Sequence, residues 1–138
     1  PGMKATLNAR IKNREPFRPF APVTRVEKLS TCFLGDHEVP FMIVVYKVRP
    51  EWKDKLSAIT HEDGTGRVQS VRREDNELYY DLLQAFEDKT GVPCLLNTSF
   101  NENEPIVHTP EQAIDCYRRT RMDCLGIGSF WLNKADGE

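Results

Sequence analysis

Hydrophobic positions follow two different patterns in the first third of the chain. Met3, Leu7 and Ile11 recur every four residues with cationic residues between them, which predicts a short amphipathic helix that ends near Asn13. Residues 41–48 form a continuous apolar run that is rich in β-branched and aromatic side chains. This second pattern predicts a central β-strand covered on both faces.

A long helix is expected over residues 76–90. Asp75 or Asn76 supplies its N-cap, and Gly91 ends it, with a proline two residues further on. The pattern is amphipathic, with acidic residues opposite an apolar face. That apolar face is expected to consist of Leu78, Tyr79, Leu82, Leu83 and Phe86.

The remaining elements follow from shorter signals. A polar turn over residues 61–67 leads into a strand near residues 68–71, and residues 92–96 form a short buried strand. Residues 109–120 begin with Thr, Pro and Glu, which favours an N-capped helix. The apolar stretch at residues 122–132 adds another strand or two. This order of helices and strands predicts an α/β or α+β sheet domain.

The composition fits one globular domain over residues 1–138. The chain is 39% hydrophobic by residue count, which excludes a disordered chain and a membrane span and allows a core without disulfides or metal. Its longest apolar stretch is too short and too central for a secretory signal. Because the chain begins at Pro1 rather than Met, we expect it to be a piece of a longer protein.

The four cysteines lie far apart in the sequence and form none of the close pairs typical of zinc or redox sites. Cys94, Cys116 and Cys124 lie in apolar or amphipathic runs, and we expect them to be buried. The three histidines show no ligand-like spacing, so no metal site is predicted. This cysteine usage favours a reducing, cytoplasmic setting.

The net charge of −2 conceals two regions of opposite sign. Residues 1–30 carry seven cations and two acids, whereas residues 74–91 carry six acids and one cation. Most asymmetry of this kind is solvated surface. The overall balance argues against nucleic acid as a partner.

Three polar clusters could support chemistry. The first consists of Lys12, Arg14 and Arg18. Arg18 lies in a segment with three prolines in seven residues, which is expected to keep its backbone extended. Fixed cations suit a phosphorylated ligand. The alternative is a set of surface cations near a helix C-terminus, where the helix dipole favours them.

The second cluster is the turn that contains His61, Asp63, Thr65 and Arg67. Its two glycines allow the backbone amides to form an anion-binding nest, with Arg67 at the entry of the following strand. A plain hairpin loop is equally compatible with the pattern. An isolated histidine such as His61 is more often structural than catalytic.

The third cluster follows the predicted strand at residues 92–96. Asn97, Thr98, Ser99 and Asn101 place two amides and two hydroxyls within five residues. We expect these side chains to bind and orient a ligand at the strand end. No neighbouring base activates Ser99 as a nucleophile.

Taken together, the three clusters resemble the C-terminal domain of the O-carbamoyltransferase family, which includes nodulation and antibiotic-tailoring carbamoyltransferases. The resemblance runs from about Met3 to Leu132 and rests on three ordered motifs. These are Lys-Asn-Arg-Glu-x-Phe-Arg-Pro-Phe-Ala-Pro at residues 12–22, His-x-Asp-Gly-Thr-x-Arg-Val-Gln-x-Val at residues 61–71, and Asn-Thr-Ser-Phe-Asn at residues 97–101 with Glu-Pro-Ile-Val at residues 104–107.

This resemblance implies an α+β fold: an open, twisted, mixed β-sheet with packed helices, YrdC-like, as in threonylcarbamoyl-AMP synthases. The Gly-Pro-Arg-Ala-Leu-Gly-type stretch that precedes the first helix in the family is missing here. The implied fold is therefore truncated at its N-terminus, without one strand, one helix and a phosphate-binding arginine. We expect reduced activity from this chain alone.

The resemblance also implies a reaction. The domain would bind carbamoyl phosphate and ATP, with Mg²⁺ arriving alongside the nucleotide, and form carbamoyl adenylate with release of pyrophosphate. A separate N-terminal domain, which carries iron in the family, would pass the carbamoyl group to a hydroxyl acceptor. By position, Lys12 and Arg67 would hold phosphate groups and Ser99 would contact the ligand. Supporting binding roles fall to Arg14, Arg18, His61, Thr65, Asn97 and Asn101.

Two other functions remain open on the sequence alone. One is a non-catalytic module that binds a nucleotide or a structured RNA through the same cations. The other is a domain that only docks on its N-terminal partner.

Overall fold

The computed structural model describes residues 2–134, which form two compact units. The sheet unit consists of Gly2 and residues 19–98. The hairpin unit consists of residues 3–18 and, among the described residues, 99–134. The single-domain expectation therefore stays a prediction, and each unit is described by itself.

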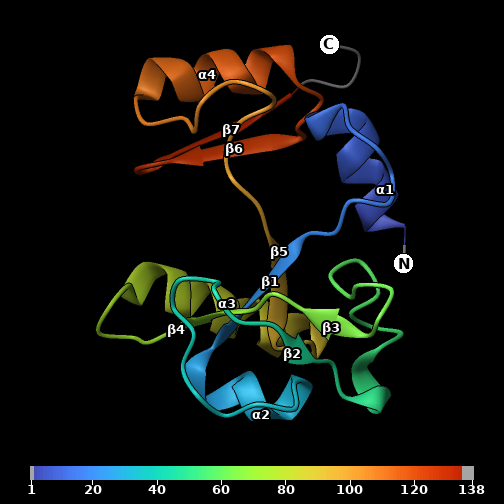
Figure 1. Ribbon diagram of the computed structural model, residues 1–138. Coiled ribbons are helices and arrows are strands. Elements are labelled where there is room, and N and C mark those ends of the chain that lie inside the picture. Colours follow the sequence, from blue (N-terminus) through green and yellow to red (C-terminus); the bar gives the residue numbers. More distant parts are fainter. Residues whose placement is uncertain (1, 135–138) are drawn as a thin grey trace. The chain divides into compact units, whose positions relative to one another are not determined.

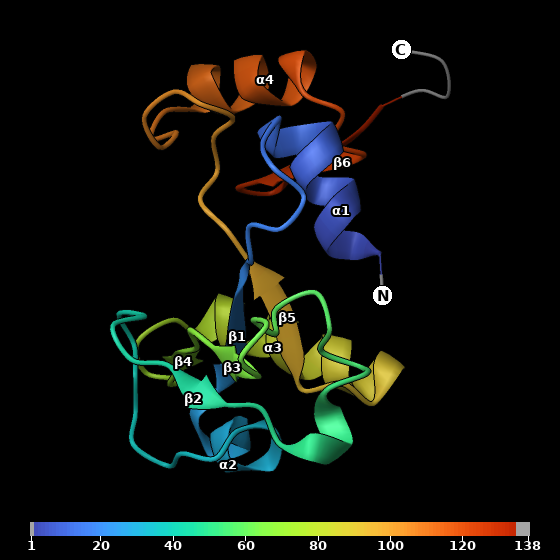
Figure 2. The ribbon, with the colours of Figure 1, turned by 45° about the vertical axis from the view of Figure 1, so that its right-hand side comes forward.

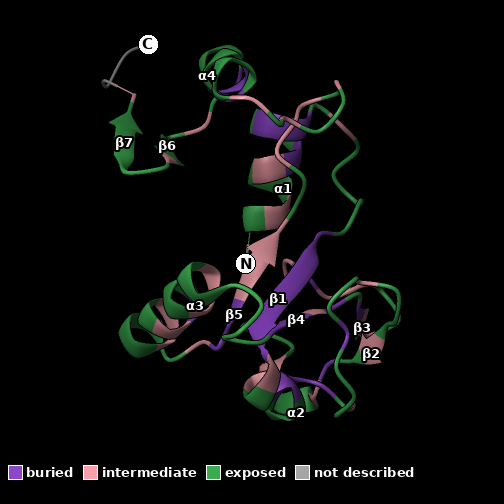
Figure 3. Ribbon diagram, turned by 90° about the vertical axis from the view of Figure 1, so that its left-hand side faces the viewer, coloured by how far each residue is buried: buried purple, intermediate pink, exposed green. Residues whose placement is uncertain are grey.

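The sheet unit is built on three strands, in the order β4 (Gln69–Val71), β1 (Ala21–Arg25) and β5 (Cys94–Asn97). Strand β1 is parallel to β4 and antiparallel to β5, with Val23 opposite Gln69 on one side and Leu95 on the other (Figures 1 and 2). A mixed sheet with helices confirms the α+β class. Every residue of β1 is buried, as Figure 3 shows.

Helix α3 (Glu77–Thr90) confirms the long helix predicted from the sequence, including both ends. The Asn76 side chain accepts a hydrogen bond from the Tyr79 backbone N–H at 3.1 Å. Gly91 ends the helix in the left-handed region with φ +70°, which a residue with a side chain rarely adopts. These local signals fix the helix boundaries independently of packing.

The apolar face of α3 is buried less completely than its pattern indicates. Leu83 is 1% exposed and packs against Val23 and Val71 of the sheet. In contrast, Leu78 is 82% exposed and Leu82 54% exposed. The three-strand sheet is narrow, so it covers only a central line of the helix.

The expectation of a central strand over residues 41–48 is wrong. Within this run only β2 (Tyr46–Lys47) is a strand, and it pairs antiparallel with β3 (Thr65–Gly66). Met42 adopts φ +53°, which interrupts an extended backbone, and Phe41 and Ile43 are exposed. β-Propensity alone does not make a strand where no neighbouring strand pairs with it.

Short helical turns complete the sheet unit. These are η2 (Val26–Lys28), α2 (Leu29–Cys32) and η3 (Pro50–Trp52). An antiparallel bridge between Phe33, which follows α2, and Val48, which follows β2, joins these two parts of the unit.

The hairpin unit begins with α1 (Met3–Leu7), which continues as the π-helical turn η1 (Asn8–Lys12) and confirms the predicted N-terminal helix. Helix α4 (Pro110–Arg119) begins after the Thr109 N-cap, and strands β6 (Cys124–Ile127) and β7 (Phe130–Asn133) form an antiparallel hairpin. The hairpin confirms the strands expected in residues 122–132.

The core of the hairpin unit contains Ala113, Tyr117 and Leu125. Cys94 and Cys116 are buried as expected, but Cys124 is exposed. Successive side chains of a strand point to opposite faces, so the burial of Leu125 directs Cys124 to solvent. No helix among residues 2–134 is long and apolar enough to cross a membrane.

Two leucines of α3 test this description of the core. Leu83→Ala removes a fully buried side chain and is expected to lower the free energy of unfolding by about 2–4 kcal/mol. Leu82→Ala, one residue away and half-exposed, is the matched control and is expected to cost less than about 1 kcal/mol. Urea denaturation followed by circular dichroism measures both, and equal losses would contradict the assigned orientation of α3.

Candidate functional site

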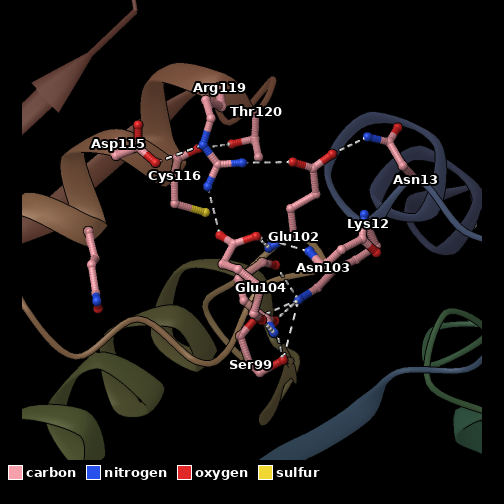
Figure 4. Close-up of polar contacts among 12 residues, drawn as sticks. Lys12, Asn13, Ser99, Glu102, Asn103, Glu104, Asp115, Cys116, Arg119 and Thr120 are labelled. Carbon is pink, nitrogen blue, oxygen red and sulfur yellow. Dashed lines mark hydrogen bonds and ion pairs between the residues drawn. The ribbon is translucent and has the colours of Figure 1, made fainter.

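A buried lysine organises the hairpin unit. Lys12 lies at the last position of η1 and is only 4% exposed. Its ammonium donates hydrogen bonds to the Ser99 carbonyl oxygen at 2.7 Å and to the carbonyl oxygen and Oδ1 of Asn101 at 2.7 and 2.8 Å. Figure 4 shows Lys12 beside Ser99, in the loop that follows β5. An ammonium has three protons, and these three short contacts use all of them.

The loop that receives Lys12 is itself tied by hydrogen bonds. The Ser99 hydroxyl donates to Asn101 Oδ1 at 2.6 Å, and Asn101 Nδ2 donates to the Glu104 carbonyl oxygen at 2.7 Å. Ser99 Oγ also lies 3.4 Å from Lys12 Nζ. The first and third sequence clusters therefore meet at one place in the hairpin unit.

Burial sets the electrostatics of this lysine. Burial lowers the pKa of Lys12 below its ordinary value, and the positive charge of Arg14 lowers it further, while Cys116 and Glu104 oppose the shift. The loop carbonyls and the Asn101 amide oxygen compensate the buried charge without a carboxylate in direct contact.

The proline-containing segment is held against η1 by Asn8, which is fully buried. Asn8 Nδ2 donates to the Arg18 carbonyl oxygen at 3.0 Å, and Asn8 Oδ1 accepts from Arg14 Nε at 2.7 Å. Burial, and then the neighbouring Arg18, lower the pKa of Arg14. Arg18 is more exposed, and its nearest carboxylate, Glu15, is 3.9 Å away.

In the sheet unit, three of the four residues named for the second cluster lie together in the predicted turn. Thr65 Oγ1 donates to Asp63 Oδ1 at 2.7 Å and lies 3.2 Å from His61 Nδ1. The Thr65 hydroxyl and backbone N–H lower the pKa of Asp63. Arg67 is exposed and forms no ion pair with any other residue that the structure describes.

Asn97 differs from its neighbours in the third cluster. It is the last residue of β5 and belongs to the sheet unit, where its Nδ2 donates to Gln69 Oε1 at 2.7 Å. Ser99 and Asn101 belong to the hairpin unit. A motif that is continuous in sequence is thus divided between the two units.

Sequence reasoning missed the roles of three charged residues that shape the loop: Glu102, Glu104 and Arg119. Glu104 Oε2 accepts hydrogen bonds from the backbone N–H groups of Glu102 and Asn103 at 3.2 and 3.0 Å. The pKa of Glu104 is lowered to about 2, first by a hydrogen bond from its own backbone N–H, then by Arg119, and then by the Glu102 and Asn103 N–H groups, while burial opposes the shift. The buried Asn8 was missed as well. The Glu-Pro-Ile-Val motif at residues 104–107 included Glu104, but nothing in the sequence assigned it a role in holding the loop.

Within residues 2–134, no group of three or more His, Cys, Asp or Glu side chains is arranged to hold a metal ion. The chemistry available to both sites is that of fixed cations, hydroxyls, amides and backbone N–H groups, which suits the binding of oxyanions.

Comparison with known proteins supports one family. The protein-family model described as carbamoyltransferase C-terminus matches residues 1–134. The nodulation protein NolO of Bradyrhizobium diazoefficiens is 44% identical over 95% of the chain. The 3'-hydroxymethylcephem-O-carbamoyltransferase of Amycolatopsis lactamdurans is 40% identical over 92% of the chain.

These relatives are much longer than the chain described here. The matched region is 25% of NolO, 24% of the Amycolatopsis enzyme and 20% of the nodulation protein NolNO of Sinorhizobium fredii, which is also 44% identical. The family match covers nearly the whole chain, including all three sequence clusters. The chain therefore belongs to the carbamoyltransferase family and corresponds to its C-terminal region.

Proposed function

We propose that the chain binds carbamoyl phosphate and ATP and takes part in forming carbamoyl adenylate, which a further domain uses to carbamoylate a hydroxyl group. The observation that carries this proposal is the contact of Lys12 with Ser99 and Asn101. Lys12 was singled out as a cation that suits a phosphorylated ligand, and Ser99 and Asn101 as side chains that would bind and orient a ligand. These residues, 87 and 89 positions apart in the sequence, meet in one unit of a carbamoyltransferase-family chain.

The proposed reaction has two steps. Water cleaves carbamoyl phosphate to carbamate and phosphate. A carbamate oxygen then bonds to the α-phosphorus of ATP, the bond from that phosphorus to the bridging β-phosphate oxygen breaks, and pyrophosphate leaves. Both steps move negative charge among phosphate oxygens, and Mg²⁺ enters with ATP as part of that substrate.

Fixed cations are the groups that such a reaction needs. Lys12 supplies a buried positive charge and holds the Ser99–Asn101 loop. Ser99 would contact a ligand oxygen by turning its hydroxyl away from Asn101 Oδ1, to which it donates in the structure. We assign Arg67 to a phosphate group because its guanidinium is exposed and outside every ion pair of the described residues. A preorganised charge of this kind contributes about 3–4 kcal/mol to stabilising a transition state.

The remaining candidates have supporting roles in this proposal. Arg14 and Arg18 extend the cationic surface of the hairpin unit, and Asn101 orients Ser99. In the sheet unit, His61 and Thr65 shape the turn before Arg67, and Asn97 ends β5.

Transfer to the acceptor is proposed to need a partner domain. The named relatives have about three-quarters of their length outside the matched region. The name of the Amycolatopsis relative specifies O-carbamoyl transfer to a 3'-hydroxymethylcephem. By inference, a hydroxyl compound is the acceptor here, and the partner domain, with its expected iron, selects it.

Lys12 is the first residue to test. Lys12→Met keeps much of the side-chain volume and removes the charge, and Ser99→Ala removes the hydroxyl while leaving the lysine. We expect both to lower carbamoyl-phosphate-dependent pyrophosphate release by the intact protein, Lys12→Met by about a hundredfold to a thousandfold. Lys4→Met, on α1, is the control and should retain wild-type turnover. Thermal unfolding of each variant separates misfolding from lost chemistry, and unchanged turnover in folded Lys12→Met would overturn the assignment.

Arg67 allows a cleaner test because it makes no ion pair with the described residues. Arg67→Gln is expected to change the free energy of unfolding by less than about 0.5 kcal/mol. At the same time it should weaken ATP binding, measured by calorimetry, by about tenfold. Lys55→Gln, an exposed cation of the same unit, is the control. Equal ATP affinities for wild type and Arg67→Gln would contradict the proposed role of Arg67 in binding ATP.

The dependence of binding on salt distinguishes ATP from RNA as the ligand. A compact nucleotide pocket is expected to show a shallow slope of log affinity against log salt. RNA held through many phosphates would show a steep one, about −0.7 for each phosphate contact on a single strand. Calorimetric titrations between low and physiological salt measure the slope for ATP and for a structured RNA. Tight, steeply salt-dependent RNA binding without ATP binding would replace the proposed function.

A further inference from the structure

One arginine of the hairpin unit bridges three carboxylates. Arg119 is the last residue of α4, and its Nε lies 2.7 Å from Asp115 on the same helix. Its two terminal nitrogens lie 3.0 Å from Glu102 Oε2 and 2.9 Å from Glu104 Oε1. Figure 4 shows this guanidinium between α4 and the loop. The planar fork thus fixes two residues of the 101–104 loop to one helix.

Hydrogen bonds connect Glu102 and Glu104 to Lys12 or to its neighbours. Glu104 accepts hydrogen bonds from two loop N–H groups, and its carbonyl oxygen accepts from Asn101, which receives the lysine ammonium. The other oxygen of Glu102 accepts a hydrogen bond from Asn13, the residue directly after Lys12. Arg119 is therefore connected to both sides of the Lys12–Asn101 contact through continuous hydrogen bonds.

Arg119 also matters for charge. Glu102 and Glu104 place two negative charges in the loop that receives Lys12, where they would repel an anionic ligand. Arg119 offsets these charges from the side of α4. Lys12 forms no ion pair with either carboxylate, because its three protons are directed to carbonyl and amide oxygens, and it acts on Glu104 only through its longer-range charge.

We infer that Arg119 is a positioning residue for the anion site, which it serves by holding Glu102 and Glu104 and thereby the Lys12–Ser99–Asn101 loop. The effect of Arg119 on ATP binding rests on the proposed function, whereas its effect on the order of the loop rests on the observed contacts alone. It assigns a role to a partly exposed side chain that touches none of the residues named as ligand contacts.

An exposed ion pair usually contributes little to stability, and the Arg119 side chain is 42% exposed. The inference therefore concerns loop order more than global stability. Three pairs on one guanidinium restrict the loop far more than any one of them, because each fixes the orientation of the same plane. A lysine at this position would keep the charge and lose that geometry.

The first measurement needs no ligand. Hydrogen exchange of the Glu102 and Asn103 amides, which donate to Glu104, reports whether the loop is held. Arg119→Met is expected to speed their exchange at least about tenfold, Arg119→Lys to give an intermediate rate, and Arg118→Met to leave it unchanged. Arg118 is a matched control because it is the neighbouring exposed arginine of α4 and has no ion pair among the described residues.

The second measurement is ATP binding to the same variants of the intact protein by calorimetry. Arg119→Met should weaken ATP binding by about tenfold, with partial recovery in Arg119→Lys. Replacing Glu102 with Gln in the Arg119→Met background should restore part of the affinity while loop exchange stays fast. A purely structural role does not predict that ATP affinity recovers while the exchange of the loop amides stays fast.

The two measurements distinguish the failure of each proposal. A wild-type protein that binds no ATP contradicts the proposed function, and the exchange rates still decide the role of Arg119. Unchanged exchange and unchanged ATP affinity in Arg119→Met overturn the positioning role. Should Arg119→Met fail to unfold cooperatively, the milder Glu104→Gln weakens the same link and is expected to speed exchange of the same two amides. Only the exchange rates are compared for this variant, because the loss of a negative charge by itself favours ATP binding.

Discussion

The hairpin unit depends on the compensation of one buried charge. Lys12 is almost completely buried, and a buried ammonium without hydrogen-bond acceptors would be too costly to retain its proton. The acceptors come from Ser99 and Asn101, so the N-terminal helix and a loop nearly ninety residues later must meet. The π-helical turn and the left-handed Asn13 that ends it place the lysine at that meeting point. A change that removes the ammonium therefore affects the loop, the entry to α4 and the site at once.

The elements that the sequence predicted well are those with local signals. Asn76 and Gly91 fix the ends of α3, and Thr109 with Pro110 fixes the start of α4, because capping hydrogen bonds and glycine conformation act within a few residues. Strands depend on partners that are distant in sequence. Residues 41–45 have strong β-propensity but no pairing strand among the described residues, whereas β1 forms across Pro22, where no strand was predicted.

The candidate site was predictable to a similar extent. Lys12, Ser99 and Asn101 were found because polar and cationic side chains gather beside predicted elements, and the structure brings these three together. Glu102 and Arg119 carried no comparable signal, since charged residues in a loop and at a helix end are ordinary surface features. Glu104 was noticed only as the first residue of the Glu-Pro-Ile-Val motif, without a role. Their roles come from the convergence of α4 on the loop. That convergence is a property of the fold, and no single segment of sequence contains it.

The proposed function would use positive charge in two ways. A lysine whose three protons are all accepted within the chain has none left for a ligand, so we expect Lys12 to act through its electrostatic field and through the shape of the loop that it holds. Direct contacts with phosphate oxygens would then fall to exposed arginines such as Arg67 and Arg18. Substitution of a buried cation should accordingly alter loop order and ligand affinity together. Substitution of an exposed one should alter affinity alone, and this difference separates the two roles in a single set of variants.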